Sequence, residues 1–308
     1  MKILITGGAG FIGSNLIKQL QRDGVDEVAV IDDFSTGFRK NLEGLDIELF
    51  EGSILDRSLL SEAAKGADSI VHLAARPSVP RSIQDPLASH HANATGTLHV
   101  LEAARQENAH VTLASSSSVY GANPQLPKSE DLRTMPISPY AVSKSATESY
   151  ALAYNAVYGL EVLPFRFFNV YGPGQAAGHA YAAVIPAFLD AAINQKPLPI
   201  HGDGLQTRDF TFVDTVTETL SRAARERISP GDAVNLAFGT RSSLMEVASV
   251  MEEVLGYSLE RNHIESRAGD VRDSQADNRS LLRLFPEVQP VELKEGIRKT
   301  ADWFTSSN

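Results

Sequence analysis

Up to residue 167, the chain alternates short apolar runs with longer segments in which apolar residues recur at helical spacing. The apolar runs span residues 2–6, 28–31, 47–50, 69–73, 110–114 and 160–167. A run without polar alternation is typical of a parallel strand that is buried on both faces. Most of these runs are separated by helical patterns, near 56–65, 86–105 and 139–158. This order predicts an α/β fold in which helices cover both faces of a doubly wound parallel sheet.

The regular alternation ends near residue 168. A helical pattern near 180–194 is flanked by turn signals at 171–174 and 201–204. A chain of 308 residues is large for one domain. We therefore expect a first domain at 1–168 and a smaller domain at 169–308, with a strand near 233–236 that returns to the first sheet.

Composition excludes several classes of protein. A net charge of −10 argues against a nucleic-acid partner, which requires basic clusters to displace counterions from phosphates. The chain has no cysteine, which removes disulfides, thiolate metal sites and cysteine nucleophiles, and no other metal-ligand cluster replaces them. No signal segment precedes the first strand and no apolar run is long enough to span a bilayer. We expect a cytoplasmic protein with no metal and no membrane partner.

A glycine-rich loop joins the first apolar run to a helix. Gly7, Gly10 and Gly13 have a spacing in which one glycine allows a tight turn, one lets a pyrophosphate approach the backbone, and one lets helix and strand pack closely. The unpaired N–H groups of the helix then face the phosphates. Asp32 follows about 20 residues later, where a carboxylate can accept from both adenosine ribose hydroxyls and repels a 2′-phosphate. The pattern predicts a Rossmann domain that binds NAD.

Tyr140 and Lys144 lie four residues apart, on one face of the predicted helix at 139–158. An ammonium group and a positive nicotinamide ring both favour the phenolate, so we expect Tyr140 to be a base with a pKa well below about 10. The serine run at 115–118 offers a hydroxyl for the reacting oxygen of a substrate. Tyrosine and lysine at this spacing also form common surface pairs, and serine runs are common in turns. After a dinucleotide loop, they favour a hydride-transfer site, with the loops after 73, 114 and 167 converging on one cleft.

Longer motifs occur along nearly the whole chain: TGGAGFIGSNL, VIDDFSTG, VHLAARPSVPRSIQDP, NATGTL, ASSSSVYG, SPYAVSK, RFFNVYGP, AYAAVIP, HGDGLQTRDFTFVD and RAGDVR. With these motifs the chain resembles the extended short-chain dehydrogenase/reductases that act on nucleotide sugars. Within that family it is most similar to the UDP-glucose and UDP-N-acetylglucosamine 4-epimerases. The combination is far more specific than any one motif.

The resemblance implies roles for residues around the cofactor. Tyr140 would be the catalytic base, Lys144 would hold the nicotinamide ribose, and Ser116 would be the hydroxyl partner. Beyond the glycines and Asp32, it implies cofactor contacts at Phe11, Ile12, Ser53, Ile54, Leu73, Ala74, Ala75 and Asn93. Ser53 is a departure, because the family usually has an aspartate there that meets the adenine amino group. The segment 235–239 is a second departure, because it reads Asn-Leu-Ala-Phe-Gly where the family usually has Asn-Ile-Gly-x-Gly.

The resemblance also implies a UDP-sugar site in the second half of the chain. Its expected residues are Ser78, Ser116, Asn169, Ala183, Val184, Arg208, Arg267, Asp270 and Ser274. Asn169, Arg208 and Arg267 would contact the diphosphate, because arginine offers a planar fork of donors. Asp270 would bind the uridine ribose. The alternatives are an Arg208 salt bridge to Asp209 or Asp214, and a solvated Arg267.

Ser274 stands where relatives restricted to glucose and galactose have a tyrosine and those that accept N-acetylated sugars have a small residue. The alternative is an exposed loop serine. We expect Ser274 to wall the sugar pocket and to leave room for an acetamido group.

The reaction implied is inversion at C4 of a UDP-hexose through a 4-keto sugar. Dehydratases of the family carry Asp-Glu where this chain has Ser117 and Ser118, and UDP-glucuronate decarboxylases carry glutamate at the second position. Glucuronate 4-epimerases remain an alternative, although many have threonine in place of Asn169. A binding module without catalysis is a minor alternative. Relatives dimerise through the helices matching 86–105 and 139–158, so we expect a homodimer.

Overall fold

The computed structural model describes residues 1–177, 183–265 and 272–306, which fall into two compact units. The first unit comprises Met1–Asn123, Arg133–Phe167 and Thr217–Val234, and the second comprises Pro124–Leu132, Phe168–Val216 and Asn235–Asn308. The main change from the first unit to the second lies between residues 167 and 168. Two segments are exceptions to this division: residues 124–132 belong to the second unit, and residues 217–234 belong to the first.

The central sheet has seven strands, six of which lie wholly in the first unit. Its order is β11 (Val234–Leu236), β6 (Val162–Phe167), β5 (His110–Ser116), β4 (Ser69–His72), β1 (Lys2–Thr6), β2 (Glu27–Asp32) and β3 (Glu48–Glu51). The pairs from β6 to β3 are parallel. The predicted doubly wound parallel sheet is thereby confirmed.

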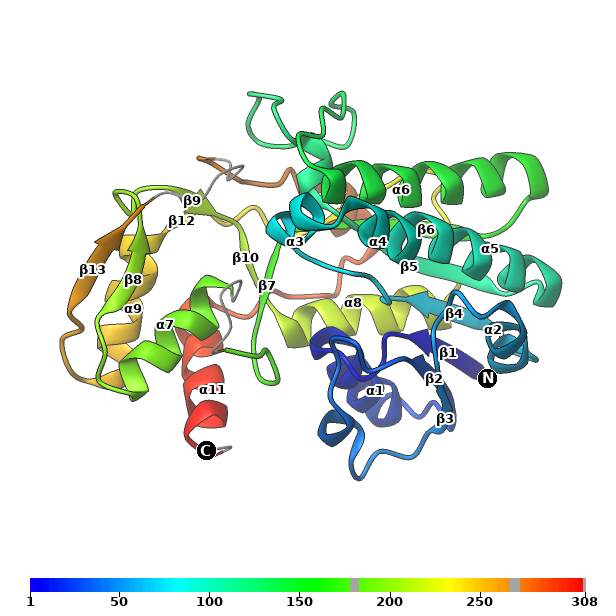
Figure 1. Ribbon diagram of the computed structural model, residues 1–308, viewed down its shortest axis with the longest axis horizontal. Helices are drawn as coiled ribbons and strands as arrows, with labels where there is room; N and C mark the ends of the chain where they lie inside the picture. The colour runs from blue at the N-terminus through cyan, green and yellow to red at the C-terminus, as the bar shows by residue number, and fades with distance from the viewer. Residues whose placement is uncertain (178–182, 266–271, 307–308) are drawn as a thin grey trace. The chain divides into compact units, whose positions relative to one another are not determined.

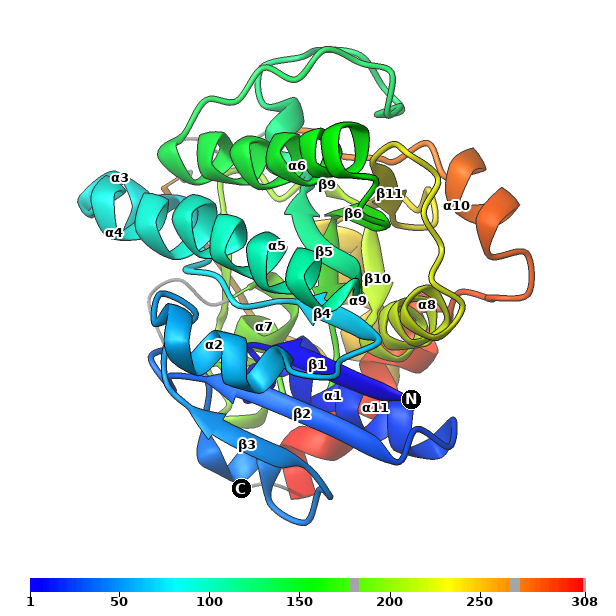
Figure 2. The same cartoon turned by 90° about the vertical axis from the view of Figure 1, so that its right-hand side faces the viewer.

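Helices cover both faces of this sheet (Figures 1 and 2). One face carries α2 (Arg57–Ala64), α5 (Gly96–Glu107) and α6 (Pro139–Tyr158), and the other carries α1 (Phe11–Arg22) and α8 (Val213–Arg225). The shorter elements are η1 (Arg39–Leu42), α3 (Val79–Gln84) and η3 (Ser117–Tyr120). Strands without polar alternation are buried on both faces, as Leu4, Ile31, Val111 and Val162 are.

The segment predicted as one helix near 86–105 is interrupted. It forms α4 (Pro86–His90), a π-helical segment η2 (His91–Thr95) and then α5. The Asn93 carbonyl oxygen accepts from the side-chain hydroxyls of Thr97 at 2.5 Å and Thr147 at 3.2 Å. These hydroxyls compete for the carbonyl with the regular helical N–H, which accounts for the wider turn.

The second unit consists of short sheets and four helices among its described residues. The strand pairs are β7 (Asn169–Tyr171) with β10 (Phe210–Phe212), β8 (Leu198–His201) with β13 (Arg261–Ile264), and β9 (Thr207–Arg208) with β12 (Ser242–Ser243). The helices are α7 (Val184–Ile193), α9 (Leu244–Leu255), α10 (Arg279–Leu284) and α11 (Leu293–Ser306). Gly296 of α11 allows close packing, because a Cβ there would lie 2.2 Å from the Tyr171 hydroxyl.

Neither a membrane span nor a metal cluster is found in the described residues. Over 1–177, 183–265 and 272–306, no helix is both long and apolar enough to cross a membrane. In the same ranges, no three His, Cys, Asp or Glu side chains are grouped so that they could hold a metal ion.

Candidate active site

The loop after β1 has no space for side chains at its glycines. Gly7 has φ +77°, and a Cβ on it would lie 2.7 Å from the Ala74 backbone nitrogen. A Cβ on Gly13 would lie 2.3 Å from the Gly7 carbonyl oxygen. Gly10 precedes α1 and makes no side-chain cap, so Phe11, Ile12 and Gly13 begin the helix with their N–H groups at its positive end. This backbone cradle fits a pyrophosphate.

Asp32 ties the end of β2 to the glycine loop. Its carboxylate accepts from the Ala9 N–H and the Phe34 N–H, each at 2.8 Å. Burial raises its pKa, and these two backbone hydrogen bonds oppose the rise. Each carboxylate oxygen keeps a lone pair for a further donor, so the group can accept from ribose hydroxyls as predicted.

Ser53 and Ile54 follow β3, next to the β2 end in the sheet. The Ser53 hydroxyl oxygen accepts from the Leu55 N–H at 3.2 Å, so it closes a local turn. Ile54 is buried, and its carbonyl contacts Nδ1 of His99 at 3.2 Å. The serine therefore lacks the reach and charge of an aspartate toward an adenine.

Leu73, Ala74 and Ala75 follow β4 on the other side of β1. The Leu73 N–H donates to the Thr6 carbonyl at 3.0 Å, and the Ala74 N–H donates to the Thr6 hydroxyl at 3.1 Å. Ser78 comes next and caps α3, where its hydroxyl accepts from the Arg81 N–H at 3.4 Å. Its φ of +108° is a backbone conformation that a serine adopts only under strain, and such strain concentrates at functional sites.

Ser116 and Tyr140 come together at the carboxyl end of β5. Ser138 caps α6 by accepting from the Ala141 N–H at 3.1 Å, and Pro139 occupies the first turn, which places Tyr140 at the start of the helix. The Ser116 side chain lies close enough to the Tyr140 hydroxyl to lower its pKa. The Ser118 hydroxyl donates to Ser116 Oγ at 2.9 Å and so holds it in place.

The protein alone does not lower the pKa of Tyr140, so the expected lowering would depend on the positive nicotinamide ring. Burial raises the pKa of Tyr140 above 10, and the nearby Ser116 side chain only partly opposes this. The Lys144 Nζ donates to the Ala114 carbonyl at 2.8 Å. Lys144 is itself buried, and burial lowers its pKa to about 8. In the protein alone, loss of hydration around the phenol therefore decides the direction of the Tyr140 pKa shift, and not the ammonium group one helical turn away.

Asn93 connects the loop after β4 to α6. Its Oδ1 accepts from the Arg76 N–H at 2.7 Å, and its Nδ2 donates to the Ser143 hydroxyl at 2.9 Å. Asn93 is 1% exposed. Its side chain supports the backbone near the predicted cofactor site, and these contacts give it no free amide to reach further.

Sequence reasoning missed a buried network behind these residues. Arg166 of β6 donates to the Glu148 carboxylate at 3.0 and 2.6 Å and to the Tyr120 hydroxyl at 2.9 Å. The Ser115 hydroxyl donates to Glu148 at 2.9 Å. The available signals were an arginine inside an apolar strand and a glutamate one turn after Lys144.

The predicted substrate residues in the second unit lie on several elements. Arg208 in β9 is 8% exposed, and its Nη1 donates to the Thr207 and Arg272 carbonyls at 2.8 and 3.1 Å. Ser274 is 6% exposed and its N–H donates to the Thr207 carbonyl at 3.1 Å, so the exposed-serine alternative is wrong.

The remaining predicted substrate residues begin two elements of the second unit or lie outside the described residues. Asn169 begins β7, and Ala183 caps α7 without a side-chain bond, directly before Val184. Arg267 and Asp270 lie outside the described residues. Asp209 accepts from the Gly239 N–H, the Thr240 hydroxyl and the Ala276 N–H at 2.8–3.1 Å. These bonds make Asp209 a support for the loops at 239 and 276.

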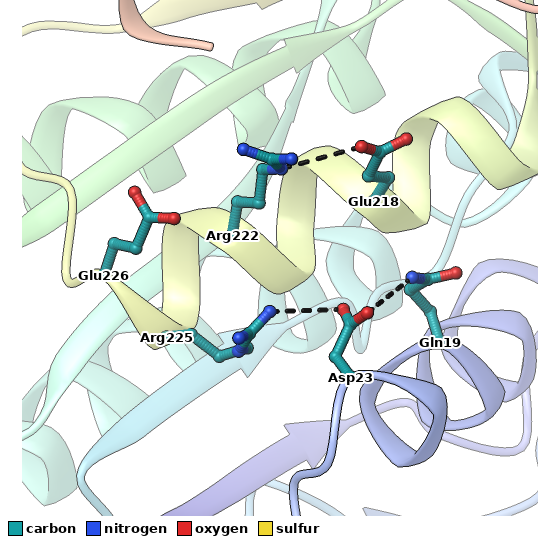
Figure 3. A pocket seen from close by; sticks show the side chains of 6 residues that line it. All are labelled: Gln19, Asp23, Glu218, Arg222, Arg225 and Glu226. Carbon is teal, nitrogen blue, oxygen red and sulfur yellow. Dashed lines mark hydrogen bonds and ion pairs between the residues drawn. The ribbon is translucent and has the colours of Figure 1, made fainter. Parts of the chain in front are cut away.

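A pocket of about 300 Å³ lies between α1 and α8 (Figure 3). Charged and amide side chains line it, namely Gln19, Asp23, Glu218, Arg222, Arg225 and Glu226. Asp23 contacts Gln19 at 3.0 Å and Arg225 at 3.5 Å, and Glu218 contacts Arg222 at 3.6 Å. The two arginines are thus paired with Glu218 and Asp23, and none of the predicted site residues lines this pocket.

Comparisons with known proteins agree with this arrangement. Residues 3–237 match the NAD-dependent epimerase/dehydratase family. The UDP-glucose 4-epimerase of Mycolicibacterium smegmatis is 36% identical over 315 residues, which covers 100% of both chains. The solved UDP-N-acetylglucosamine 4-epimerase of Methanobrevibacter ruminantium M1 is 33% identical with a TM-score of 0.94, covering 100% of this chain and 99% of that one.

A third relative was solved with NAD. The UDP-glucuronic acid 4-epimerase of Bacillus cereus, in complex with UDP-glucuronic acid and NAD, is 30% identical with a TM-score of 0.91 and 100% coverage of both chains. The predicted family, the NAD cofactor and the epimerase type of enzyme are confirmed. With its glycine cradle and its Ser116–Tyr140 pair, the chain belongs to the NAD-dependent epimerase/dehydratase family.

Proposed function

We propose that this enzyme inverts the configuration at C4 of the hexose in a UDP-sugar. The proximity of the Tyr140 hydroxyl and the Ser116 side chain carries the proposal, because it brings a base and a donor together in the unit that holds the glycine cradle. Gly7, Gly10 and Gly13 would hold the cofactor pyrophosphate, and Asp32 would hold the adenosine ribose.

The chemistry divides between the cofactor and the protein. NAD, held by the glycine cradle and Asp32, would supply a hydride acceptor for C4 and a hydride donor for the 4-keto sugar. Tyr140 takes the proton of the 4-hydroxyl as the carbonyl forms and gives it back in the reverse step. Ser116 donates to the same oxygen and orients it. Lys144, with its pKa lowered to about 8 by burial, holds the ribose hydroxyls beside Tyr140.

Other reactions of the family need a carboxylate in η3. Dehydration and decarboxylation would use acidic side chains where this chain has Ser117 and Ser118, and the Ser118 hydroxyl is bonded to Ser116. Epimerisation of UDP-glucuronate, the reaction named for the Bacillus cereus relative, remains the second candidate.

We also propose that the sugar pocket accepts an acetamido group. Ser274 is buried and small, and Ala183 at the start of α7 adds no bulk. The relative from Methanobrevibacter ruminantium acts on an N-acetylated sugar nucleotide. These features favour both UDP-glucose and UDP-N-acetylglucosamine as substrates.

A second copy of the chain is the partner that fits α6. Its small residues Ala141 and Ala151 are buried inside the unit, so they are not available for a dimer. The helix nevertheless exposes large apolar and aromatic side chains, with Val142 53%, Val157 70% and Tyr158 56% exposed. Burying them against a second α6 would remove apolar surface from water.

One experiment tests the reaction. The purified enzyme is incubated, without added NAD, with UDP-glucose, UDP-galactose, their N-acetylated forms and UDP-glucuronate, and the products are separated by chromatography. We expect interconversion of C4 epimers and release of NAD when the protein is denatured, because every hydride is returned. Products that have lost water or carbon dioxide would indicate the dehydratase or decarboxylase reaction. No product and no absorbance change near 340 nm would indicate a binding module.

A further inference from the structure

A buried histidine connects the strands of the glycine cradle with the helices of the catalytic site. His72 is the last residue of β4 and is 3% exposed. Its Nδ1 lies 2.7 Å from the hydroxyl of Thr6, the last residue of β1. Its Nε2 lies 3.0 Å from the hydroxyl of Thr97 in α5. Both ring nitrogens are therefore used.

The direction of each hydrogen bond follows from its neighbours. The Thr97 hydroxyl donates to the Asn93 carbonyl at 2.5 Å, so it must accept from His72 Nε2–H. At the other end, the Thr6 hydroxyl accepts from the Ala74 N–H at 3.1 Å and can donate to the Nδ1 lone pair. The ring is thus assigned as the neutral Nε2–H tautomer, which supplies one acceptor and one donor.

The chain of bonds continues from Asn93 to the catalytic helix. The Asn93 Nδ2 donates to the Ser143 hydroxyl at 2.9 Å, and that hydroxyl donates to the Tyr140 carbonyl at 2.8 Å. At its other end, Ala74 is the residue whose backbone nitrogen leaves no space for a Cβ on Gly7. One continuous set of hydrogen bonds therefore joins the phosphate cradle to the backbone of the proposed base.

The environment keeps the ring neutral. Burial, together with the positive charge of Lys144, lowers the pKa of His72 to about 3. A proton on Nδ1 would remove the acceptor that Thr6 uses. The ring's hydrogen bonds thus keep one direction over the working pH range of an enzyme.

We propose that His72 is a positioning residue, which sets the cradle formed by Gly7 and Ala74 in register with Tyr140 through Thr6, Thr97 and Asn93. The kinetic part of this inference rests on the proposed function. A shift of about 1 Å between reacting groups can cost roughly 100-fold in rate, so a bond chain of this kind is able to control the rate without touching the substrate.

The chain offers a matched control in His110. It is fully buried in the neighbouring strand β5, and both its ring nitrogens are bonded, to the Ser69 hydroxyl at 3.1 Å and to the Ile228 carbonyl at 3.0 Å. His110 begins β5, whereas Ser116 ends it, so it lies at the opposite end of the strand from the site. Leucine at either position removes a similar buried ring.

We expect His72→Leu to lower kcat by about 10- to 100-fold with little change in KM, and His110→Leu to lose similar stability with kcat within about threefold of wild type. His72→Gln, whose amide can donate toward Thr97, should recover part of kcat. If His72→Leu does not fold, the kcat values of His72→Gln and His110→Leu can still be compared. Equal kcat losses for the two leucine variants, or no recovery with glutamine, would overturn the positioning role.

Two readouts do not depend on turnover. Nitrogen NMR of the imidazoles, assigned with His72→Gln, should show the neutral Nε2–H tautomer for His72 at pH 7, and an Nδ1–H or charged ring would overturn the bond chain. The NAD released on denaturation should be lower for His72→Leu than for His110→Leu, and equal occupancy would contradict the link to the cradle. A wild type that turns over no sugar nucleotide would refute the proposed function, and these two readouts would still decide on His72.

Discussion

The buried ion pair of Glu148 and Arg166 gives a quantitative test of how the site is supported. Both side chains are less than a tenth exposed. Arg166 makes two bonds to the carboxylate, at 3.0 and 2.6 Å, and Ser115 donates a third at 2.9 Å. Burial alone would lower the pKa of Arg166, but the bond with Glu148 raises it above its usual value. A guanidinium is not deprotonated in proteins, so Arg166 stays charged when Glu148 is removed.

We expect Glu148→Leu to destabilise the first unit by about 3–5 kcal/mol. The two charge-assisted bonds lost by Arg166 are worth roughly 1.5–3 kcal/mol each, which gives about 3–6 kcal/mol in total. This agrees with the roughly 3–5 kcal/mol that removing one partner of a buried ion pair costs. Arg166 keeps the Tyr120 hydroxyl at 2.9 Å and the Tyr120 ring at 4.9 Å.

The double variant Glu148→Leu with Arg166→Met should lose far less unfolding free energy than the sum of the losses of the two single variants. It removes the uncompensated charge and replaces the pair with apolar side chains, which is often nearly neutral. We expect a coupling free energy of at least about 2 kcal/mol from the double-mutant cycle.

Urea unfolding followed by far-ultraviolet circular dichroism measures these differences. Trp303 in α11 is the only tryptophan of the chain and belongs to the second unit, so its fluorescence follows that unit separately. The control is Glu161→Gln, because the Glu161–Arg227 pair in the first unit is 46% and 34% exposed. Exposed pairs contribute about 0–1 kcal/mol.

The reasoning would be refuted by a Glu148→Leu loss no larger than that of Glu161→Gln, or by additive losses in the cycle. A functional loss should accompany the structural one. Ser115 precedes Ser116 and Glu148 follows Lys144 by one helical turn, so kcat should fall even at temperatures where the variant is folded.

Three further predictions concern the site. Tyr140→Phe should lower kcat by about 10² to 10⁴-fold and leave the NAD content of the purified protein unchanged, because it removes the proton acceptor and keeps the ring; near wild-type turnover would mean that the base is misassigned. Ser274→Tyr should lower kcat/KM for UDP-N-acetylglucosamine by roughly 5- to 150-fold and spare UDP-glucose, because a ring in a buried site costs about 1–3 kcal/mol of clash; equal losses for both sugars would contradict the wall assignment. The pKa of His72 is lowered from 6.5 to about 3 in the folded protein. Between pH 6.5 and pH 3, the unfolded chain therefore binds a proton on this ring that the folded protein does not bind. The contribution of His72 to stability is present above pH 6.5 and is lost as the pH falls. Urea unfolding should show a loss of about 2 kcal/mol from this ring between pH 7 and pH 5 that is missing in His72→Gln, and an equal loss in that variant would contradict the shift.

Much of the fold and the site is predictable from local sequence. Apolar runs without alternation identify buried parallel strands, because each residue of such a strand meets a covering layer on one face or the other. The glycine spacing and the Asp32 position follow from backbone sterics and from the length of one strand, helix and strand unit. Tyr140 and Lys144 share a helix face for the same local reason, the helical period.

Other features depend on residues that are distant in the sequence. The π-helical turn at Asn93 needs the hydroxyl of Thr147, and the raised pKa of Tyr140 needs the burial of its hydroxyl beside Ser116. The Glu148–Arg166 pair joins α6 to β6, and the burial of Ser274 follows from its packing beside Thr207. Periodicity is a property of neighbouring residues, whereas desolvation and buried hydrogen bonding sum over every element packed around a group. The sequence alone therefore determined which chemistry is present, and only the tertiary structure decided the protonation, the orientation and the support of the groups that perform it.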